Sequence, residues 1–139
     1  MNRRDFIALA SLTSVTLALP LAVRAAGLPY TPALLAERLA AGDTVFLDFK
    51  ASWCSTCKAQ ERVLAALKAE TPEYEKRITF IDVDWDEYGR SDIVQTLKIP
   101  RRSTLVVLRG DQELGRIVAQ TGRAEIKALM DTALQAANS

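Results

Sequence analysis

Residues 44–58 read TVFLDFKASWCSTCK, and this stretch decides how the chain folds. Its first part, Thr44–Phe49, is almost continuously apolar, as expected of a central strand that is covered on both faces of a sheet. A turn follows, and a helix is predicted from about Cys54, because apolar residues then recur at helical spacing. The stretch therefore predicts a strand–turn–helix unit that places Cys54 and Cys57, the two cysteines of the chain, at the start of the helix.

Further elements are predicted on both sides of this unit. Hydrophobic periodicity and turn residues give the order α-β-α-β-α-β-β-α, in which the early alternation favours parallel strands joined by crossover helices. The late strand pair around Gly110-Asp111 is a hairpin that adds an antiparallel edge. The expected fold class is α/β, with a central mixed sheet of about four strands flanked by helices. Helices are expected over 33–41 and 91–97 and after Gly122, and strands over 78–83, 104–108 and 114–119.

The composition excludes several classes of function. The chain has 139 residues, 18 Lys and Arg, 17 Asp and Glu, and a formal net charge of +1, so no basic excess indicates a nucleic-acid partner. It has no histidine, which excludes His-based catalytic triads, His metal sites and haem attachment through C-x-x-C-H. Two thiolates alone do not fill a four-coordinate zinc site. We expect a monomer without metal or other cofactor.

Residues 1–25 have the three-part layout of an export signal. Two arginines, Arg3 and Arg4, begin it, an uncharged apolar stretch follows, and small residues near Ala25 resemble a cleavage site. The arginine pair with Phe6 two positions later resembles the twin-arginine export motif. We therefore expect export by that route.

Cleavage near Ala25 would leave residues 26–139 as a single domain with 15 basic and 16 acidic residues. This domain would work in the periplasm, which is an oxidising compartment. The alternative is an uncleaved leader that tethers the domain to the inner membrane, because its uncharged stretch is just long enough to span a bilayer.

The spacing of Cys54 and Cys57 predicts dithiol chemistry. The free N–H groups and the macrodipole of the helix would stabilise a Cys54 thiolate, and Lys58 adds positive charge. We expect the pKa of Cys54 to fall to roughly 6–7.5 from about 8.5. Cys57, one turn into the helix, would attack a mixed disulfide on Cys54 and release the substrate reduced. A modest pKa depression indicates a reducing couple.

Other interpretations of the cysteine pair remain open. A purely structural disulfide over this spacing closes a small loop and constrains little of the unfolded chain. The same chemistry in the opposite direction would make the protein an oxidant or an isomerase. From different classes come a non-catalytic binding or assembly module and a copper-handling protein, although the chain has no His and few Met.

Asp48 is the polar exception in the predicted buried strand. A carboxylate there costs several kcal/mol unless it is paired or protonated. It precedes Cys54 by six residues, so a buried Asp48 with a raised pKa would accept the proton of Cys57, directly or through a water. The alternative is an aspartate that caps a loop at the strand end.

Residues 45–58, VFLDFKASWCSTCK, resemble the active-site signature of the thioredoxin family, and a weaker pattern extends over 32–134. The resemblance implies a thioredoxin-like fold and thiol–disulfide exchange. It makes Cys54 the attacking thiol, Cys57 the resolving thiol and Asp48 the buried base.

The exported chain is also similar to periplasmic reducing domains that take electrons from a membrane thiol transporter. The implied partners are protein thiols and disulfides, together with such a membrane thiol donor. We therefore expect an exported thiol–disulfide oxidoreductase that reduces protein disulfides.

The chain departs from the family in the residues just before the predicted strand over 104–108. The family usually has a cis-proline directly before a Thr-Leu strand start, but here Arg101-Arg102-Ser103 separate Pro100 from Thr104. We favour Ser103 over Pro100 at that position, with a trans peptide bond and an available N–H. The residues expected to contact substrate are Trp53, Ile99, Pro100 and Ser103. The two arginines are a candidate contact for an acidic partner, or simply a solvated loop.

The second departure concerns the strand beside Asp48. Some family members carry a lysine there, opposite the buried aspartate, and Phe80 is expected to take its place. Asp48 would then lack a cationic neighbour, which favours its neutral form.

Overall fold

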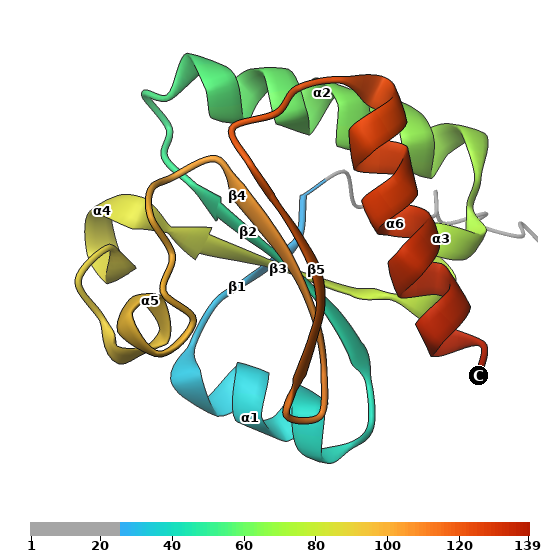
Figure 1. Cartoon of the computed structure of the whole chain (residues 1–139), viewed down its shortest axis with the longest axis horizontal. Helices are drawn as coiled ribbons and strands as arrows, with labels where there is room; N and C mark the ends of the chain where they lie inside the picture. The colour runs from blue at the N-terminus through green and yellow to red at the C-terminus, as the bar shows by residue number, and fades with distance from the viewer. Residues whose placement is uncertain (1–25) are drawn as a thin grey trace, which may run out of the picture.

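Five strands form one mixed sheet in the order β1-β3-β2-β4-β5 (Figure 1). The computed structural model describes residues 26–139. The strands are β1 (Leu28–Pro29), β2 (Thr44–Lys50), β3 (Thr79–Asp84), β4 (Thr104–Arg109) and β5 (Gln112–Val118). The helices are α1 (Pro32–Ala40), α2 (Ser55–Glu70), α3 (Glu73–Arg77), α4 (Trp85–Tyr88), α5 (Asp92–Thr96) and α6 (Arg123–Ala137). The expected α/β class is confirmed, whereas the leader, residues 1–25, lies outside the described residues, and its export and cleavage stay predictions.

The strand directions follow from the connections. Strands β1, β2 and β3 run parallel, and β4 runs antiparallel to both β2 and β5. The strand that was not expected is β1, where Leu28 pairs with Ile81 of β3. Two residues are too few for an alternating pattern to be seen in the sequence.

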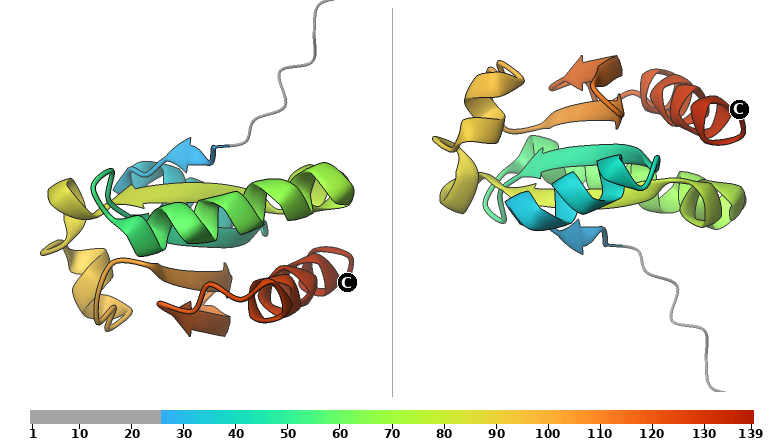
Figure 2. Two further views of the ribbon diagram at one scale, coloured as in Figure 1. Left: turned by 90° about the horizontal axis from the view of Figure 1, so that it is seen from above. Right: turned by 90° about the horizontal axis from the view of Figure 1, so that it is seen from below.

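Strand β2 is buried because helices cover both faces of the sheet (Figure 2). Successive side chains of a strand point to opposite faces. Phe46 accordingly packs in the core cluster with Leu64 of α2 and Met130 of α6. Its neighbours Val45 and Leu47 pack in the second cluster, on the face that carries α1 and α5. Asp48 shares the strand face of Phe46, which directs its carboxylate toward α2.

Helix α2 begins at the cysteine motif and ends just before Pro72. Cys54 is its N-cap, and Thr71 is its C-cap, next to a proline that cannot continue a helix. One stripe of the helix is buried, at the spacing of three and four residues that marks a helix face. Its members are Cys57, Gln60, Leu64, Leu67 and Lys68.

Two short helices were not predicted. Helix α3 has five residues and α4 has four, so neither is long enough to show a hydrophobic period. Across the described residues 26–139, no helix has the length and apolar character needed to cross a bilayer.

Candidate active site

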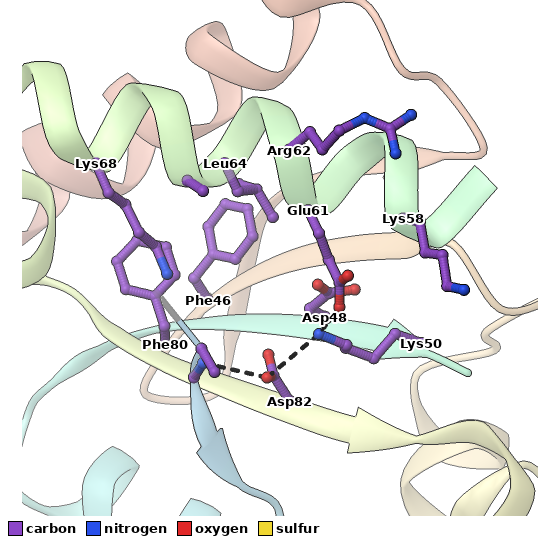
Figure 3. Close-up of a pocket in the computed structure, with 13 residues that line it drawn as sticks. Phe46, Asp48, Lys50, Lys58, Glu61, Arg62, Leu64, Lys68, Phe80 and Asp82 are labelled. Atoms are coloured by element: carbon purple, nitrogen blue, oxygen red, sulfur yellow. Dashed lines mark hydrogen bonds and ion pairs between the residues drawn. The ribbon is translucent and has the colours of Figure 1, made fainter. Parts of the chain in front are cut away.

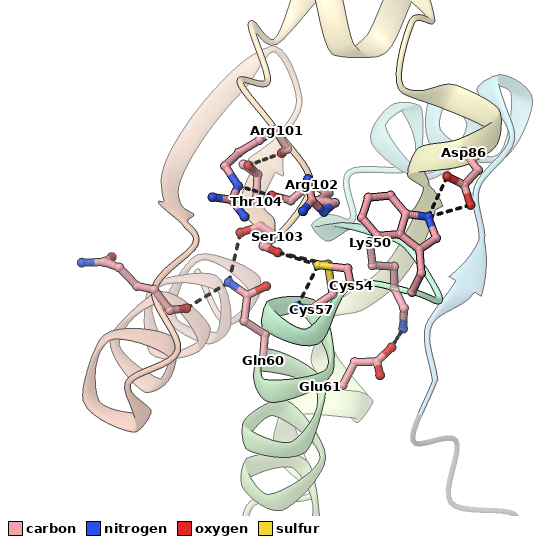
Figure 4. Close-up of a disulfide and its surroundings, with 12 residues drawn as sticks. Lys50, Cys54, Cys57, Gln60, Glu61, Asp86, Arg101, Arg102, Ser103 and Thr104 are labelled. Carbon is pink, nitrogen blue, oxygen red and sulfur yellow. Dashed lines mark hydrogen bonds and ion pairs between the residues drawn. A yellow bond between two sulfur atoms is a disulfide. The ribbon is translucent and has the colours of Figure 1, made fainter.

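The two cysteines lie where the chain leaves β2 and enters α2. Their sulfurs are at disulfide distance and their Cα atoms are 5.3 Å apart (Figure 4). The Sγ of Cys54 accepts a hydrogen bond of 3.2 Å from the backbone N–H of Cys57. Opening the disulfide would leave a Cys54 thiolate next to the unpaired N–H groups of the helix, which stabilise negative charge.

Both cysteines are buried, next to a small surface rim formed by Trp53, Asp86 and Arg102. Cys54 is 2% exposed and Cys57 is 1% exposed, whereas the adjacent Trp53 is 56% exposed. The indole N–H of Trp53 donates to both carboxylate oxygens of Asp86, at 3.0 and 3.1 Å. The guanidinium of Arg102 lies 4.4 Å from the centre of the Trp53 ring. The cysteine pair is thus buried directly beside an exposed aromatic residue.

Ser103 lies directly against the disulfide. Its Oγ is 3.2 Å from the Sγ of Cys54 and 3.0 Å from the Sγ of Cys57 (Figure 4). Pro100 is exposed, three residues earlier, and Ile99 is buried in the core cluster on the α1 and α5 face. Of the three residues at 99, 100 and 103 that were expected to contact substrate, the serine is the one in contact with the sulfurs.

The backbone of Ser103 differs from the sequence expectation in one respect. No peptide bond among the described residues is cis, so the bond before Ser103 is trans. Its N–H is not free, however, because it donates to the carbonyl oxygen of Phe49 at 2.7 Å. The expectation of an N–H available to a partner is therefore wrong: β2 already uses it.

Gln60 is a buried polar residue near the site that the sequence analysis missed. It is fully buried, and its Nε2 donates to the carbonyl oxygens of Ser103 at 3.0 Å and Gln120 at 2.9 Å. The available signal was its position on the buried stripe of α2, between Cys57 and Leu64. A polar residue on an apolar helix stripe needs partners in the core, and here they are backbone carbonyls before β4 and after β5.

Asp48 is buried on the α2 face of β2 and is 5% exposed. Among the described residues, its Oδ1 is a buried atom without a hydrogen-bond partner. Burial raises the pKa of Asp48 to about 7, and the nearby Asp82 carboxylate acts in the same direction, whereas Lys50 and Lys68 act against it. A carboxyl group with such a pKa exchanges protons readily near neutral pH.

The expected register next to Asp48 is wrong. The residue that pairs with Asp48 on β3 is Asp82, and Phe80 pairs with Phe46 two positions earlier. Asp48 also has cationic neighbours, since Lys50 and Lys68 lower its pKa. The pKa of Asp48 is nevertheless raised, because burial and the second carboxylate outweigh these two lysines.

A pocket of about 460 Å³ adjoins Asp48 between β2, β3 and α2 (Figure 3). Lys50 in its wall forms ion pairs with Glu61 of α2 and, at 3.5 Å, with Asp82 of β3. The ammonium group of Lys68 lies 3.9 Å from the centre of the Phe80 ring. The buried Asp48 is one of the residues that line this pocket.

The metal alternatives gain no ligands from the fold. In the part of the chain that the structure describes, no cluster of three or more His, Cys, Asp and Glu side chains is placed to hold a metal ion.

Comparisons with known proteins agree with this geometry. The Thioredoxin family profile matches residues 29–132. Thioredoxin H2-1 of Oryza sativa is 30% identical over 95 residues, which are 68% of this chain and 64% of that protein. The mitochondrial thioredoxin-2 of Schizosaccharomyces pombe is 35% identical over 92 residues, 66% of this chain and 62% of that protein. The crystal structure of Trxlp from Edwardsiella tarda is similar with a TM-score of 0.64 and 30% identity, and the match covers 75% of this chain and 98% of that one. The chain spans less than two thirds of the length of these two curated relatives.

Proposed function

The chain belongs to the thioredoxin family, and we propose that it catalyses thiol–disulfide exchange on protein substrates through Cys54 and Cys57. The observation that carries this proposal is the position of the pair: both sulfurs lie at disulfide distance at the N-terminus of α2. A structural disulfide over so short a loop would add little stability. Redox exchange is the role that fits the position of the cysteine pair.

The reaction proceeds in two displacements. The Cys54 thiolate attacks one sulfur of a substrate disulfide, forms a mixed disulfide and expels the other substrate sulfur as a thiolate, which takes a proton. The Cys57 thiol then gives its proton to the Asp48 carboxylate, directly or through a water, and its thiolate attacks the Cys54 sulfur. The second substrate thiolate leaves, and the enzyme holds the Cys54–Cys57 disulfide. Two electrons have passed from the enzyme dithiol to the substrate, and a dithiol donor must restore them.

The physiological direction we propose is reduction of protein disulfides. Ser55 and Thr56, the residues between the cysteines, carry no positive charge, so the thiolate is stabilised mainly by the helix. A moderately stabilised thiolate belongs to a reducing couple.

The expected reduction potential of the Cys54/Cys57 couple is about −270 mV, measured by equilibration with glutathione or a reference thioredoxin. A potential of about −120 mV would instead identify an oxidant and contradict the reducing direction. The Cys54→Ser variant, which cannot form the disulfide, is the blank for this titration.

The partners we propose are protein disulfides as substrates and a membrane thiol transporter as electron donor, with the protein acting as a monomer. The exposed Trp53 has Arg102 stacked on its ring and Asp86 bonded to its indole N–H, so the surface beside the disulfide is aromatic and carries charges of both signs. Arg102 is the group in this surface that would pair with an acidic segment near the substrate disulfide.

Export to the periplasm through the twin-arginine route is also proposed, on the basis of residues 1–25 alone. Replacing Arg3 and Arg4 together by lysine is expected to keep the full-length precursor in the cytoplasm, because the route requires the arginine pair. Cell fractionation followed by N-terminal sequencing measures both location and cleavage near Ala25. Unchanged export of the double variant would point to the general secretory route.

A further inference from the structure

The hydroxyl group of Ser103 is placed between the two reacting sulfurs. Its Oγ is 3.2 Å from Cys54 Sγ and 3.0 Å from Cys57 Sγ, and Ser103 is 0% exposed. Within residues 26–139, the structure gives this oxygen no other hydrogen-bond partner. A buried hydroxyl group is normally hydrogen-bonded, so its proton needs an acceptor. Here the acceptors within reach are the two sulfurs.

The backbone N–H and carbonyl groups of Ser103 are both fixed by hydrogen bonds. Its φ of +63° lies in the left-handed region, which is uncommon for serine, and its N–H donates to the carbonyl oxygen of Phe49 at 2.7 Å. Its carbonyl oxygen accepts from the N–H of Ala119 at 2.8 Å and from Nε2 of Gln60 at 3.0 Å. With both backbone groups fixed to β2, α2 and the end of β5, the hydroxyl is the one group of the residue that is free to turn.

We propose that Ser103 is a catalytic residue that donates its hydroxyl hydrogen to whichever sulfur carries the negative charge, and that Gln60 positions it. This inference rests on the proposed thiol–disulfide exchange at Cys54 and Cys57. It assigns to this chain a hydrogen-bond donor at a place where the family usually has proline, which has no hydroxyl.

The two displacements move the negative charge from one sulfur to the other. Before the attack, the charge is on Cys54, and the hydroxyl donates to that thiolate. Formation of the mixed disulfide removes this charge, and transfer of the Cys57 proton to Asp48 creates a new thiolate on Cys57. The hydroxyl then turns about its Cβ–Oγ bond toward the second sulfur, without movement of any heavier atom. A hydrogen bond to an ionised partner in a buried site is stronger than one between neutral groups.

Proline would not suit this position in the present backbone. The proline ring holds φ at about −65°, whereas Ser103 has a φ of +63°, and proline would remove the N–H that bonds to Phe49. The loop is therefore built around a residue that keeps its N–H, and the hydroxyl is the additional group that serine brings.

The test removes the hydroxyl in two ways, by Ser103→Ala and by Ser103→Gly. Glycine adopts positive φ without strain, so it separates the loss of the hydroxyl from any disturbance of the backbone. In the fully reduced protein, the pKa of Cys54 is read from the pH dependence of iodoacetamide alkylation, followed by mass spectrometry at that residue. Both variants are expected to raise the pKa of Cys54 by about one unit, which slows alkylation about ten-fold below both pKa values.

A matched control removes a different buried hydroxyl. Thr44 is 2% exposed and lies at the opposite end of β2 from the cysteine motif. Thr44→Val is expected to leave the pKa of Cys54 unchanged.

The role of Gln60 is tested by a double-mutant cycle. Gln60→Met keeps the length of the side chain and removes its donor to Ser103. In the wild-type background it is expected to raise the pKa of Cys54 by less than Ser103→Ala does. In the Ser103→Ala background it is expected to have no further effect, because a positioning residue acts only through the hydroxyl. An equal effect in both backgrounds would contradict the positioning role.

The outcomes separate this inference from the proposed function. Equal pKa values of Cys54 in the wild type, Ser103→Ala and Ser103→Gly would overturn the role of the hydroxyl, even if the enzyme still reduces disulfides. A shift in the alanine variant but not in the glycine variant would also overturn it, because the backbone would then be the cause. The proposed exchange itself fails on different evidence, namely wild-type turnover that does not exceed that of Cys54→Ser.

Discussion

Cys54→Ser is expected to abolish the reduction of insulin disulfides, lowering the rate to that of the dithiol reagent alone. A serine hydroxyl at this position is not ionised at neutral pH and is no nucleophile toward disulfides, whereas a thiolate stabilised by the helix is. After subtraction of the reagent rate, the enzyme-dependent rate should fall by on the order of a thousand-fold or more, as is usual when the nucleophile itself is removed. Turbidity of precipitating insulin chains measures it.

The matched variant is Cys57→Ser, which removes the resolving thiol and leaves Cys54 in place. It is expected to complete the first displacement and then stop as a covalent mixed disulfide. Mass spectrometry under non-reducing conditions would show the adduct at Cys54 in this variant and none in Cys54→Ser. The chain has no third cysteine to confuse the assignment.

This pair of variants also separates an enzyme from a binding module. A module that holds its partner without turnover predicts that the wild type reduces insulin no faster than Cys54→Ser. A copper-handling protein predicts binding of copper by the reduced dithiol in an anaerobic titration, with loss of binding in either variant.

The strand–turn–helix unit could be predicted because its signals are contiguous. A buried strand, a turn and an amphipathic helix follow one another over residues 44–70, and both cysteines lie at their junction. Asp48 was conspicuous for the same reason: it is the charged residue within the otherwise apolar run Thr44–Phe49. The local sequence was therefore sufficient to identify the two cysteines and the buried aspartate as the candidate reactive residues.

The surroundings of the sulfurs come from distant parts of the chain and were harder to predict. Ser103 is 49 positions from Cys54 in sequence, and the position before Thr104 was favoured only by analogy with the family. Nothing in a sequence reveals that its N–H is occupied by Phe49, because the loop geometry decides that. Gln60 was missed because a single polar residue on a helix stripe has no partner visible in the sequence.

The error in strand register has a specific cause. Side chains in a strand alternate with a period of two, so a shift of two residues leaves every side chain on its expected face. Phe80 and Asp82 therefore both satisfy the burial pattern of β3, and only the pairing of the backbones places Asp82 beside Asp48. The second carboxylate was thus invisible to pattern analysis, although it contributes to the raised pKa of Asp48.

Asp48→Asn is expected to make the protein more stable at alkaline pH. Burial raises the pKa of Asp48 from 3.8 to about 7, so the folded state holds this proton more tightly than the unfolded state does. Above pH 7 the folded protein bears a buried carboxylate that the unfolded chain would solvate. The shift corresponds to about 4 kcal/mol, and since the amide of asparagine is also a buried polar group, we expect a gain of about 2–4 kcal/mol.

The sign of the pH dependence follows from the same shift. Between about pH 4 and pH 7 the folded state binds more protons at Asp48 than the unfolded state, so wild-type stability falls as the pH rises through this window. Below it, both states are protonated and the cost of the buried charge disappears. Urea titrations at several pH values should show this decline in the wild type and its loss in Asp48→Asn. Asp111→Asn, in the exposed turn between β4 and β5, should retain the wild-type slope.

The same substitution is expected to slow the resolving step by about a hundred-fold, within the range for loss of a general base. The measurement is single-turnover release of a thiol from a preformed mixed disulfide on Cys54. In the wild type its rate should rise with pH through about 7, as Asp48 becomes able to take the Cys57 proton, and this inflection should be missing from Asp48→Asn. A variant that gains stability but resolves the mixed disulfide at the wild-type rate would mean that the buried carboxyl group lowers stability and has no role in the resolving step. Slower resolution together with higher stability would mean that the chain keeps a costly buried acid because the second displacement needs a general base.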